Sequence, residues 1–263
     1  SGDKVHIAYY NVADGDLVYV TNAGGGWDAA TVDSDGDTGK YVSMKLDADG
    51  NAHIGYYDVT NARLRYATNA SSTWAAETAD SSASAGKYAS LRIDSSGKIH
   101  IIYYDETNQD LKLATNITGN WEGATIDSDG DVGLWTSLAI GTADKLHVSY
   151  LDKTNLDLKY ATNASGSWVK TAVDTTDSMG YYTSLTLSKT GKAYISYYDS
   201  TNADLKYATN FAGGWILKTI DSLNTVGTFT SIAVDSSNFV HISYFHFDNK
   251  DLRYINNNQQ VCE

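Results

Sequence analysis

The apolar residues of this chain fall in short stretches of five or six residues, separated by turns rich in Gly, Asn, Asp and Ser. A representative part of the chain contains four such stretches, at residues 182–187, 194–198, 205–209 and 215–220. β-Branched and aromatic residues are frequent in them, which is typical of β-strands. No stretch shows a sustained apolar period of about 3.6 residues, so the pattern predicts an all-β fold.

The four-stretch pattern repeats every 47 residues along the whole chain. The stretches that correspond to residues 194–198 begin at His6, His53, His100, His147, Tyr194 and His241. Two further sets of equivalent residues recur at the same 47-residue spacing, and we call each set a column. They are the tryptophans Trp27, Trp74, Trp121, Trp168 and Trp215, and the aspartates Asp33, Asp80, Asp127, Asp174 and Asp221. Such constancy within one chain indicates a structural unit that is used again and again.

A 47-residue unit of four antiparallel strands predicts a β-propeller, in which each repeat forms one blade. The chain begins with a second strand (residues 5–10) and ends after a third strand (residues 252–255). Six blades, of which the two terminal ones have three strands, are favoured because they keep the aromatic segment 241–247 packed. Five blades with a left-over hairpin, in which residues 229–234 complete the first blade, are the alternative. We expect one domain over residues 1–263.

Composition narrows the possible partners. The chain has 32 acidic and 19 basic residues, a net charge of −13, which argues against nucleic acid and anionic membranes. No window reaches the roughly 18 consecutive apolar residues of a membrane span, so we expect no membrane insertion. The one cysteine, Cys262, cannot form a disulfide within the chain. It is a candidate for self-association between chains, as are the terminal strands.

Several motifs of the repeat resemble a known group of propellers. The first strand carries Ser-Leu-x-Leu-Asp, an Asp/Ser-Gly turn follows, the second strand carries His-Ile-x-Tyr-Tyr-Asp, and a Trp opens the fourth strand. Together they resemble the blades of bacterial extracellular propellers grouped as sialidase-like, over essentially the entire chain. The Asp-box of that group, Ser-x-Asp-x-Gly-x-x-Trp, is not reproduced. The resemblance implies a β-propeller fold and activity on, or binding of, glycans.

The turns between second and third strands and the connections between blades are predicted to emerge on one face. Loops on a rigid scaffold commonly form binding sites, and aromatic rings beside carboxylates and amides suit carbohydrate. Candidate glycan-binding residues on this face are Tyr41, Asp58, Asn61, Tyr88, Asp105, Asn108, Trp135, Asp152, Asn155, Tyr182, Asp199 and Asn202. The alternative is that Asp and Asn form Asx-turns and the aromatic rings pack between blades.

Two connections between blades have carboxylates at alternate positions and a Gly, as at the start of a calcium loop. The candidate calcium ligands are Asp33, Asp35, Asp37, Asp127, Asp129 and Asp131, with solvated acidic loops as the alternative. The histidine column is a poorer metal candidate, because one histidine per blade keeps the imidazoles apart. We expect each histidine to make one repeated hydrogen bond instead.

These observations favour a secreted or surface-exposed propeller that binds glycans or cell-surface polysaccharide, or acts as an adhesion module, without catalysis. Near-identical blades favour binding over catalysis, because no single position differs from its equivalents as a catalytic residue would. A sialidase-like glycan-degrading enzyme is one alternative, although the four arginines (Arg63, Arg65, Arg92 and Arg253) form no triad in register. A structural subunit joined through its terminal strands is another. Low Lys content, abundant Thr, Asn, Tyr and Gly, and the acidic charge favour a secreted or cell-surface protein of a bacterium.

Overall fold

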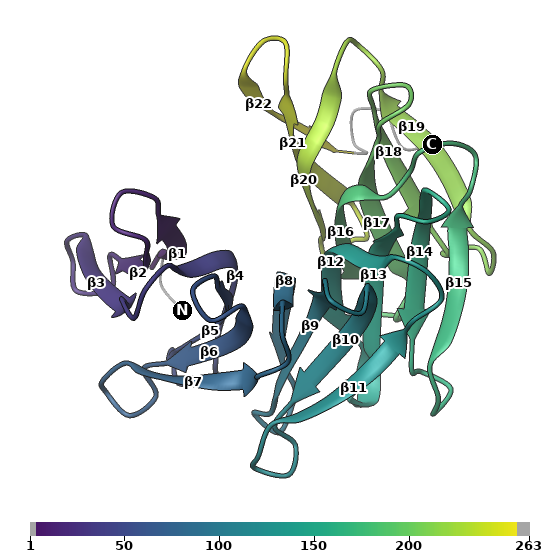
Figure 1. The fold of residues 1–263 in the computed structure, drawn as a ribbon. Coiled ribbons are helices and arrows are strands. Elements are labelled where there is room, and N and C mark those ends of the chain that lie inside the picture. Colours follow the sequence, from purple (N-terminus) through teal and green to yellow (C-terminus); the bar gives the residue numbers. More distant parts are fainter. Residues whose placement is uncertain (1–3, 257–263) are drawn as a thin grey trace. The chain divides into compact units, whose positions relative to one another are not determined.

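The computed structural model describes residues 4–256, and its strands follow the predicted pattern. Six antiparallel sheets succeed one another along the chain (Figure 1), and each is one blade of a β-propeller. Four sheets have four strands, and the first and last have three. The prediction of six blades is therefore confirmed. The five-blade alternative is wrong, because β20 pairs with β21 in the last sheet. Cys262 lies outside the described residues.

The chain divides into two compact units, Ser1–Thr125 and Ile126–Glu263. The expectation of one domain stays a prediction. The first unit contains blade 1 (β1 His6–Asn11, β2 Asp16–Thr21, β3 Asp28–Asp33), blade 2 (β4 Thr38–Leu46, β5 Ala52–Asp58, β6 Arg63–Thr68, β7 Ala75–Asp80) and blade 3 (β8 Ala85–Ile93, β9 Ile99–Asp105, β10 Asp110–Thr115, β11 Glu122–Asp127). The last residues of β11 belong to the second unit.

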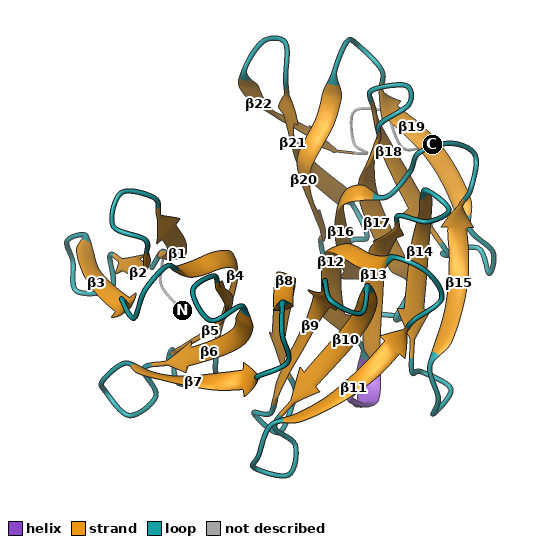
Figure 2. Cartoon of the chain, viewed as in Figure 1, coloured by secondary structure: helices purple, strands orange, loops and turns teal. Residues whose placement is uncertain are grey.

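The second unit contains blade 4 (β12 Val132–Ile140, β13 Leu146–Asp152, β14 Asp157–Thr162, β15 Val169–Asp174), blade 5 (β16 Tyr181–Leu187, β17 Ala193–Asp199, β18 Asp204–Thr209, β19 Ile216–Asp221) and blade 6 (β20 Val226–Val234, β21 Val240–His246, β22 Asp251–Asn256). A short 3₁₀ turn, Thr142–Asp144, links β12 to β13 (Figure 2). None of the helical residues described forms a segment long and apolar enough to cross a membrane.

A carboxylate at the end of the last strand of blades 1 to 5 joins that strand to the following blade, and it is buried at Asp33, Asp127 and Asp174 and half-buried at Asp80 and Asp221. Asp127 accepts a hydrogen bond from the hydroxyl of Tyr150 at 2.8 Å and forms an ion pair with Lys159 at 2.7 Å. We call this arrangement a carboxylate junction. The other junctions are Asp33 with Tyr56 and Arg65, Asp80 with Tyr103 and Lys112, Asp174 with Tyr197 and Lys206, and Asp221 with Tyr244 and Arg253. In blade 1 the position of the basic residue is taken by Val18, which is buried.

The junctions shift the ionisation of their members in opposite directions. Burial opposes ionisation of Asp127, but the hydrogen bonds from Lys159, Lys170 and Tyr150 outweigh it and hold the pKa of this carboxyl below its ordinary value. The pKa values of Asp80 and Asp174 are lowered by the same balance. Burial, reinforced by the neighbouring carboxylate charge, raises the pKa of the Tyr150 hydroxyl. At Asp80, Asp127 and Asp174 the junction is thus a charged carboxylate held by a neutral phenol and a cation.

Neighbouring blades are also joined at their first strands by hydrogen bonds from backbone amides to serine hydroxyls. The amide of Leu185 donates to the Ser137 hydroxyl at 3.0 Å, and that of Ile232 donates to the Ser184 hydroxyl at 3.2 Å. Gly86, the second residue of β8, has φ +116° and lies so close to the preceding blade that an added Cβ would be 2.8 Å from the Cα of Leu64. A side chain at that position would displace backbone, so the repeated Gly sets how closely two sheets approach.

Two lysines at one junction give a matched test of its energetics. Lys159→Met is expected to lower the free energy of unfolding by about 3 kcal/mol, because it leaves the buried Asp127 without its buried cation. Lys170→Met removes an equally short ion pair to Asp127, but the Lys170 side chain is 40% exposed against 12% for Lys159. We expect it to cost under about 1 kcal/mol. Urea unfolding of both variants measures the difference, and equal losses would contradict this account.

Stability is expected to fall at both ends of the pH scale. The lowered pKa values of Asp80, Asp127 and Asp174 contribute stability above the unfolded value of about 4, and it is lost as the pH falls below it. The raised pKa values of the buried tyrosines contribute stability below about pH 10 that is lost as the pH rises further. Thermal melting from pH 3 to pH 11 should show a plateau between these limits. A steady decline across the neutral range would exclude the junctions as its main source.

Candidate functional site

The predicted loop face is held together by hydrogen bonds between its two kinds of loop. The amide of Val59, in the turn after β5, donates to the carbonyl of Asp37 at 2.8 Å, and the amide of Asp37 donates to the Thr60 hydroxyl at 2.8 Å. The same backbone contact joins Lys153 to Asp131 and Ser200 to Ser178. These contacts confirm that the turns between second and third strands lie beside the connections between blades.

The aspartates of these turns are buried beneath the face. Asp58 accepts hydrogen bonds from the backbone amide and the side-chain amide of Asn61, both at 2.9 Å, and pairs with Arg63 at 3.2 Å. The same Asx-turns are formed by Asp105 with Asn108, Asp152 with Asn155 and Asp199 with Asn202. The asparagines are exposed, whereas the aspartates are buried. The structure thus shows the turn role for both residue types, and their part in glycan binding stays a prediction.

The acidic connections use most of their carboxylates for other contacts. Asp33 and Asp127 belong to carboxylate junctions, Asp37 pairs with Lys40 at 3.3 Å and Asp131 pairs with Lys153 at 2.9 Å. Asp35 and Asp129 are exposed. Within residues 4–256, no group of three or more His, Cys, Asp or Glu side chains is arranged to hold a metal ion. Calcium binding here stays a prediction that these contacts do not support.

The histidine column makes the expected repeated hydrogen bond. Nδ1 of His6, His53 and His241 lies 2.5 Å from the hydroxyl of a third-strand tyrosine, and His147 contacts Tyr160 in the same way. His100 differs because its blade has Leu113 in place of that tyrosine. Its ring contacts Asp94 at 3.0 Å and Thr115 at 3.2 Å.

The predicted aromatic column has an unusual backbone. Its members occupy the left-handed region at φ values of 52–54° and lie at a register shift of the first strand. We call them the aromatic series: Tyr41 and Tyr88 in the first unit, and Trp135, Tyr182 and Phe229 in the second. A left-handed conformation is uncommon for bulky residues. The β-bulge at each position turns one aromatic side chain out of the strand's regular alternation.

Within each unit the rings of the series lie against one another. Ring centroids are 4.7 Å apart for Tyr41 and Tyr88, 4.2 Å for Trp135 and Tyr182, and 4.5 Å for Tyr182 and Phe229. Each unit therefore has a short row of rings that crosses from one blade to the next. Phe229 is 67% exposed, so one end of the second row is open to solvent.

Polar groups flank the row in the first unit. Lys40 pairs with Asp37 and lies 5.1 Å from the ring centroid of Tyr10. Lys87 pairs with Glu106 at 2.6 Å and lies 5.7 Å from the ring centroid of Tyr57. The equivalent residues in the second unit are Leu134, Tyr181 and Thr228. Sequence reasoning missed these lysines, although a Lys directly before an aromatic column in two repeats was a usable signal.

The structure thus offers one candidate surface in each unit: a row of rings on the first strands of neighbouring blades, joined in the first unit by the lysine–carboxylate pairs of Lys40 and Lys87. Such a mixture of aromatic faces and a few placed polar groups is typical of small-molecule sites. Buried aspartates lie below the surface rather than on it.

Comparison with known proteins identifies the fold and no family. No protein-family model and no curated protein matches the chain. A PL25 polysaccharide lyase, an ulvan lyase solved bound to -[GlcA(1-4)Rha3S]-, has a TM-score of 0.67 and 12% identity over 97% of this chain and 78% of its own. The polysaccharide lyase Uly1 has a TM-score of 0.55 and 9% identity over 97% of this chain and 79% of its own. A protein of unknown function from Dyadobacter fermentans has a TM-score of 0.60 and 11% identity over 88% of this chain and 79% of its own.

At such identities the likeness shows a shared fold alone. Two of these three structures are polysaccharide lyases by name. The sialidase-like resemblance stays a prediction, because no family model supports it.

The left-handed backbone of the aromatic series can be tested at its most exposed member. Phe229→Gly is expected to be about 1 kcal/mol more stable than Phe229→Ala, because Gly adopts a φ of 52° without the penalty of a Cβ. Ala233→Gly, on the same strand outside the left-handed region, should instead destabilise by about 1 kcal/mol. Urea unfolding measures all three variants. The same sign at both positions would argue against strain at residue 229.

Proposed function

We propose that this protein is a secreted or surface-exposed glycan-binding module that binds saccharide along its aromatic series, without catalysis. The observation that carries the proposal is the repeated left-handed conformation of the five aromatic residues. Each such conformation costs on the order of 1–2 kcal/mol in a residue with a Cβ. Strained backbone at one repeated position points to a role for the side chain that it presents.

The geometry of the rings fits the chemistry of a saccharide. A pyranose has an apolar C–H face and a rim of hydroxyls, so it can lie on an aromatic ring while polar groups bind the rim. Tyrosine supplies both an apolar face and a hydroxyl. In the first unit Lys40 and Lys87 directly precede Tyr41 and Tyr88 and pair with Asp37 and Glu106, so an acidic sugar would bind these lysines in place of their carboxylate partners. Several weak sites on one protein add through effective concentration, which favours a polymeric ligand.

The fold comparison supports a saccharide as the ligand. The structure with a TM-score of 0.67 is a lyase with a bound saccharide that contains glucuronic acid and a sulfated rhamnose. We extend saccharide binding to this chain as a proposal. Lysines beside the rings favour an anionic polysaccharide over a neutral one.

The arginines support the non-catalytic version of the proposal. Arg63 pairs with Asp58, Arg65 with Asp33 at 2.9 Å and Arg253 with Asp221 at 3.6 Å, and Arg92 donates to its neighbour's carbonyl at 2.7 Å. Each guanidinium therefore has a structural partner, whereas a sialidase-like site would use several arginines together for one substrate carboxylate.

Binding is tested by affinity electrophoresis and calorimetry with anionic and neutral polysaccharides. Trp135→Ala and Tyr182→Ala are each expected to weaken binding about five- to thirtyfold, since a stacked ring contributes roughly 1–2 kcal/mol. Trp27→Ala is the matched control, because Trp27 is 61% exposed and lies outside the series. Unchanged binding in the series variants, or equal loss with Trp27→Ala, would overturn the site.

Release of new reducing ends from the polysaccharide that binds best separates binding from catalysis. We expect none above the level of heat-treated protein. Steady release that survives purification and is lost in Tyr182→Ala would replace the binding module with a glycan-degrading enzyme at the same surface.

A further inference from the structure

A cavity of about 330 Å³ lies between blades 4 and 5, at the turns that join their first and second strands. The residues that line it include Ile140, Gly141 and Thr142 of blade 4 and Leu187, Ser188 and Lys189 of blade 5. Two aliphatic side chains, two hydroxyls and one ammonium group therefore surround it. The aromatic series lies at the other end of the same strands, since Trp135 is near the beginning of β12 and Ile140 is its last residue.

In blades 2, 3 and 6 the same turn begins with an aspartate that holds the histidine of the column. In blade 3, Asp94 accepts hydrogen bonds from the backbone amides of Ser96 at 2.9 Å and Lys98 at 2.8 Å. Its other carboxylate oxygen lies 3.0 Å from Nε2 of His100. The equivalent contacts are those of Asp47 with its turn and His53, and of Asp235 with its turn and His241. One carboxylate thus serves two amides and an imidazole.

Blade 4 keeps the histidine but lacks the aspartate. Gly141 stands at the aspartate position, 47 residues after Asp94. Nδ1 of His147 contacts a tyrosine hydroxyl, as in blades 1, 2 and 6, but no hydrogen bond joins its Nε2 to another residue of 4–256. His147 is 7% exposed. A Cβ added to Gly141 would lie 2.8 Å from this Nε2 and 3.3 Å from Leu187, so the space left by the missing side chain borders both the imidazole and a wall of the cavity.

The unpartnered nitrogen is a hydrogen-bond donor. Burial lowers the pKa of the His147 imidazole, which keeps it neutral, and burial raises the pKa of the Tyr160 hydroxyl to about 12, so the phenol keeps its proton. A neutral imidazole carries a single N–H. At His53 a carboxylate faces Nε2, so Nε2 is the donor and Nδ1 accepts from the phenol. The same arrangement at His147 directs an N–H toward Gly141, where no acceptor stands, and an unmet buried donor is costly.

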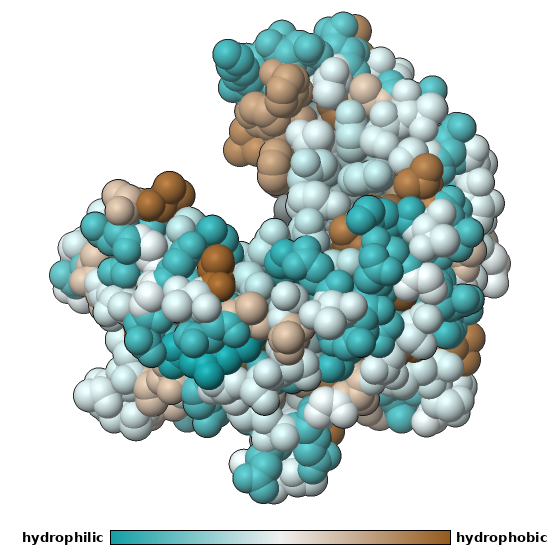
Figure 3. Space-filling model, viewed as in Figure 1, coloured by the Kyte–Doolittle hydropathy of each residue, from teal (hydrophilic) through white to brown (hydrophobic). Residues whose placement is uncertain are grey.

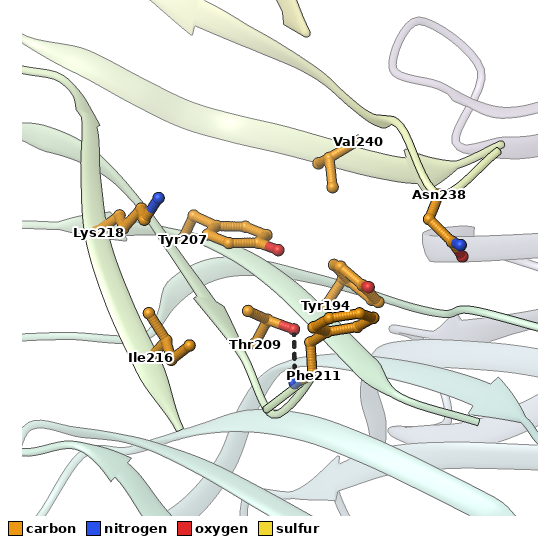
Figure 4. Close-up of a pocket in the computed structure, with 8 residues that line it drawn as sticks. All are labelled: Tyr194, Tyr207, Thr209, Phe211, Ile216, Lys218, Asn238 and Val240. Atoms are coloured by element: carbon orange, nitrogen blue, oxygen red, sulfur yellow. Dashed lines mark hydrogen bonds between the residues drawn. The ribbon is translucent and has the colours of Figure 1, made fainter. Parts of the chain in front are cut away.

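Blade 5 has a different residue at the histidine position. The equivalent of His147 is Tyr194, whose ring centroid lies 6.2 Å from that of Tyr207. Both rings line a separate cavity between blades 5 and 6 (Figure 4). Among blades 2 to 6, a column histidine that faces no carboxylate is therefore found in blade 4.

The turns beside the cavity also carry less negative charge than their equivalents. Ser188 takes the aspartate position in blade 5, and its hydroxyl accepts a hydrogen bond from the amide of Lys192 at 3.1 Å. Hydrophilic side chains cover much of the face shown in Figure 3 and the net charge is −13, yet Lys189 forms no ion pair with any residue of 4–256. Asp144, the one carboxylate of the two turns, does not line the cavity. An anion in the cavity would thus meet an unpaired cation.

We propose that the cavity between blades 4 and 5 binds the carboxylate group of a small ligand, which takes the place of the missing aspartate. The carboxylate accepts the Nε2–H of His147 past the bare Cα of Gly141, and the Lys189 ammonium balances its charge. Ile140 and Leu187 contact the apolar part of the ligand. The volume is at the small end of the range for ligand pockets, which fits a short-chain acid or one acidic monosaccharide. The proposal is independent of saccharide binding along the aromatic series.

Proton–nitrogen NMR of the histidine rings tests the site with sodium propionate and sodium glucuronate at constant ionic strength. We expect either acid to shift the ring signals of His147 saturably and to leave those of His100 unchanged, because Asp94 already faces Nε2 of His100. Tighter binding of propionate would identify the ligand as a free short-chain acid, and tighter binding of glucuronate would identify it as a uronic acid. Absence of a saturable shift at His147, or the same shift with sodium chloride, would overturn the proposal.

Two substitutions test the groups that hold the carboxylate. Lys189→Met is expected to weaken binding at least about threefold, because it removes the cation of the cavity. Lys192→Met is the matched control, since Lys192 belongs to the same turn but does not line the cavity. Gly141→Ala places a methyl group against Nε2 and should abolish the His147 response. Thermal melting checks that each variant is folded. Unchanged binding in folded Lys189→Met, or equal loss with Lys192→Met, would exclude this cavity as the site.

Discussion

The ion pair and hydrogen bond at the aspartate of each carboxylate junction are the contacts on which the rest of this structure depends. A carboxylate taken out of water is costly unless a cation and donors surround it. Here the cation and the phenol always come from the blade that follows, 32 and 23 residues further along the chain. A sheet that slipped by one residue would turn its tyrosine or its cation away from the aspartate. The junctions therefore select one register between sheets, where apolar packing alone would tolerate several.

This requirement explains why the repeat could be detected so clearly and why the contacts of its aspartates could not be predicted. Strand positions and the number of blades follow from short-range alternation and a fixed period, and both are written in the sequence. The role of Asp33 and Asp127 in the carboxylate junctions cannot be predicted in this way. A carboxylate after a strand has the same local sequence pattern whether it faces solvent or a tyrosine of another blade. The Asx-turns of Asp58 and its equivalents were foreseen as an alternative, since Asp and Asn three residues apart are a local signal. The left-handed backbone of the aromatic residues had no such signal.

The carboxylate junctions hold in place the strands that carry the aromatic rows. A ring held on a bulge is useful for recognition only if the strand beneath it stays in place, and the buried carboxylates, the serine contacts and the close glycine approach all fix that strand. The two rows then differ in what surrounds them. Lysines and carboxylates flank the tyrosines of the first unit, while Leu134, Tyr181 and Thr228 take the place of such lysines in the second. This difference between the two rows is missed when only the residues that are constant in every repeat are considered.

Val18 has a consequence for how such a molecule could grow by gene duplication. A duplicated 47-residue segment inserted ahead of blade 1 would end in an aspartate and deliver it to a site where a valine is buried and no cation is available. The insertion would be unstable until that valine was exchanged for lysine or arginine. A duplication at this place would therefore need a second change, whereas an aspartate delivered beside Arg65, Lys112, Lys159, Lys206 or Arg253 would meet a ready partner.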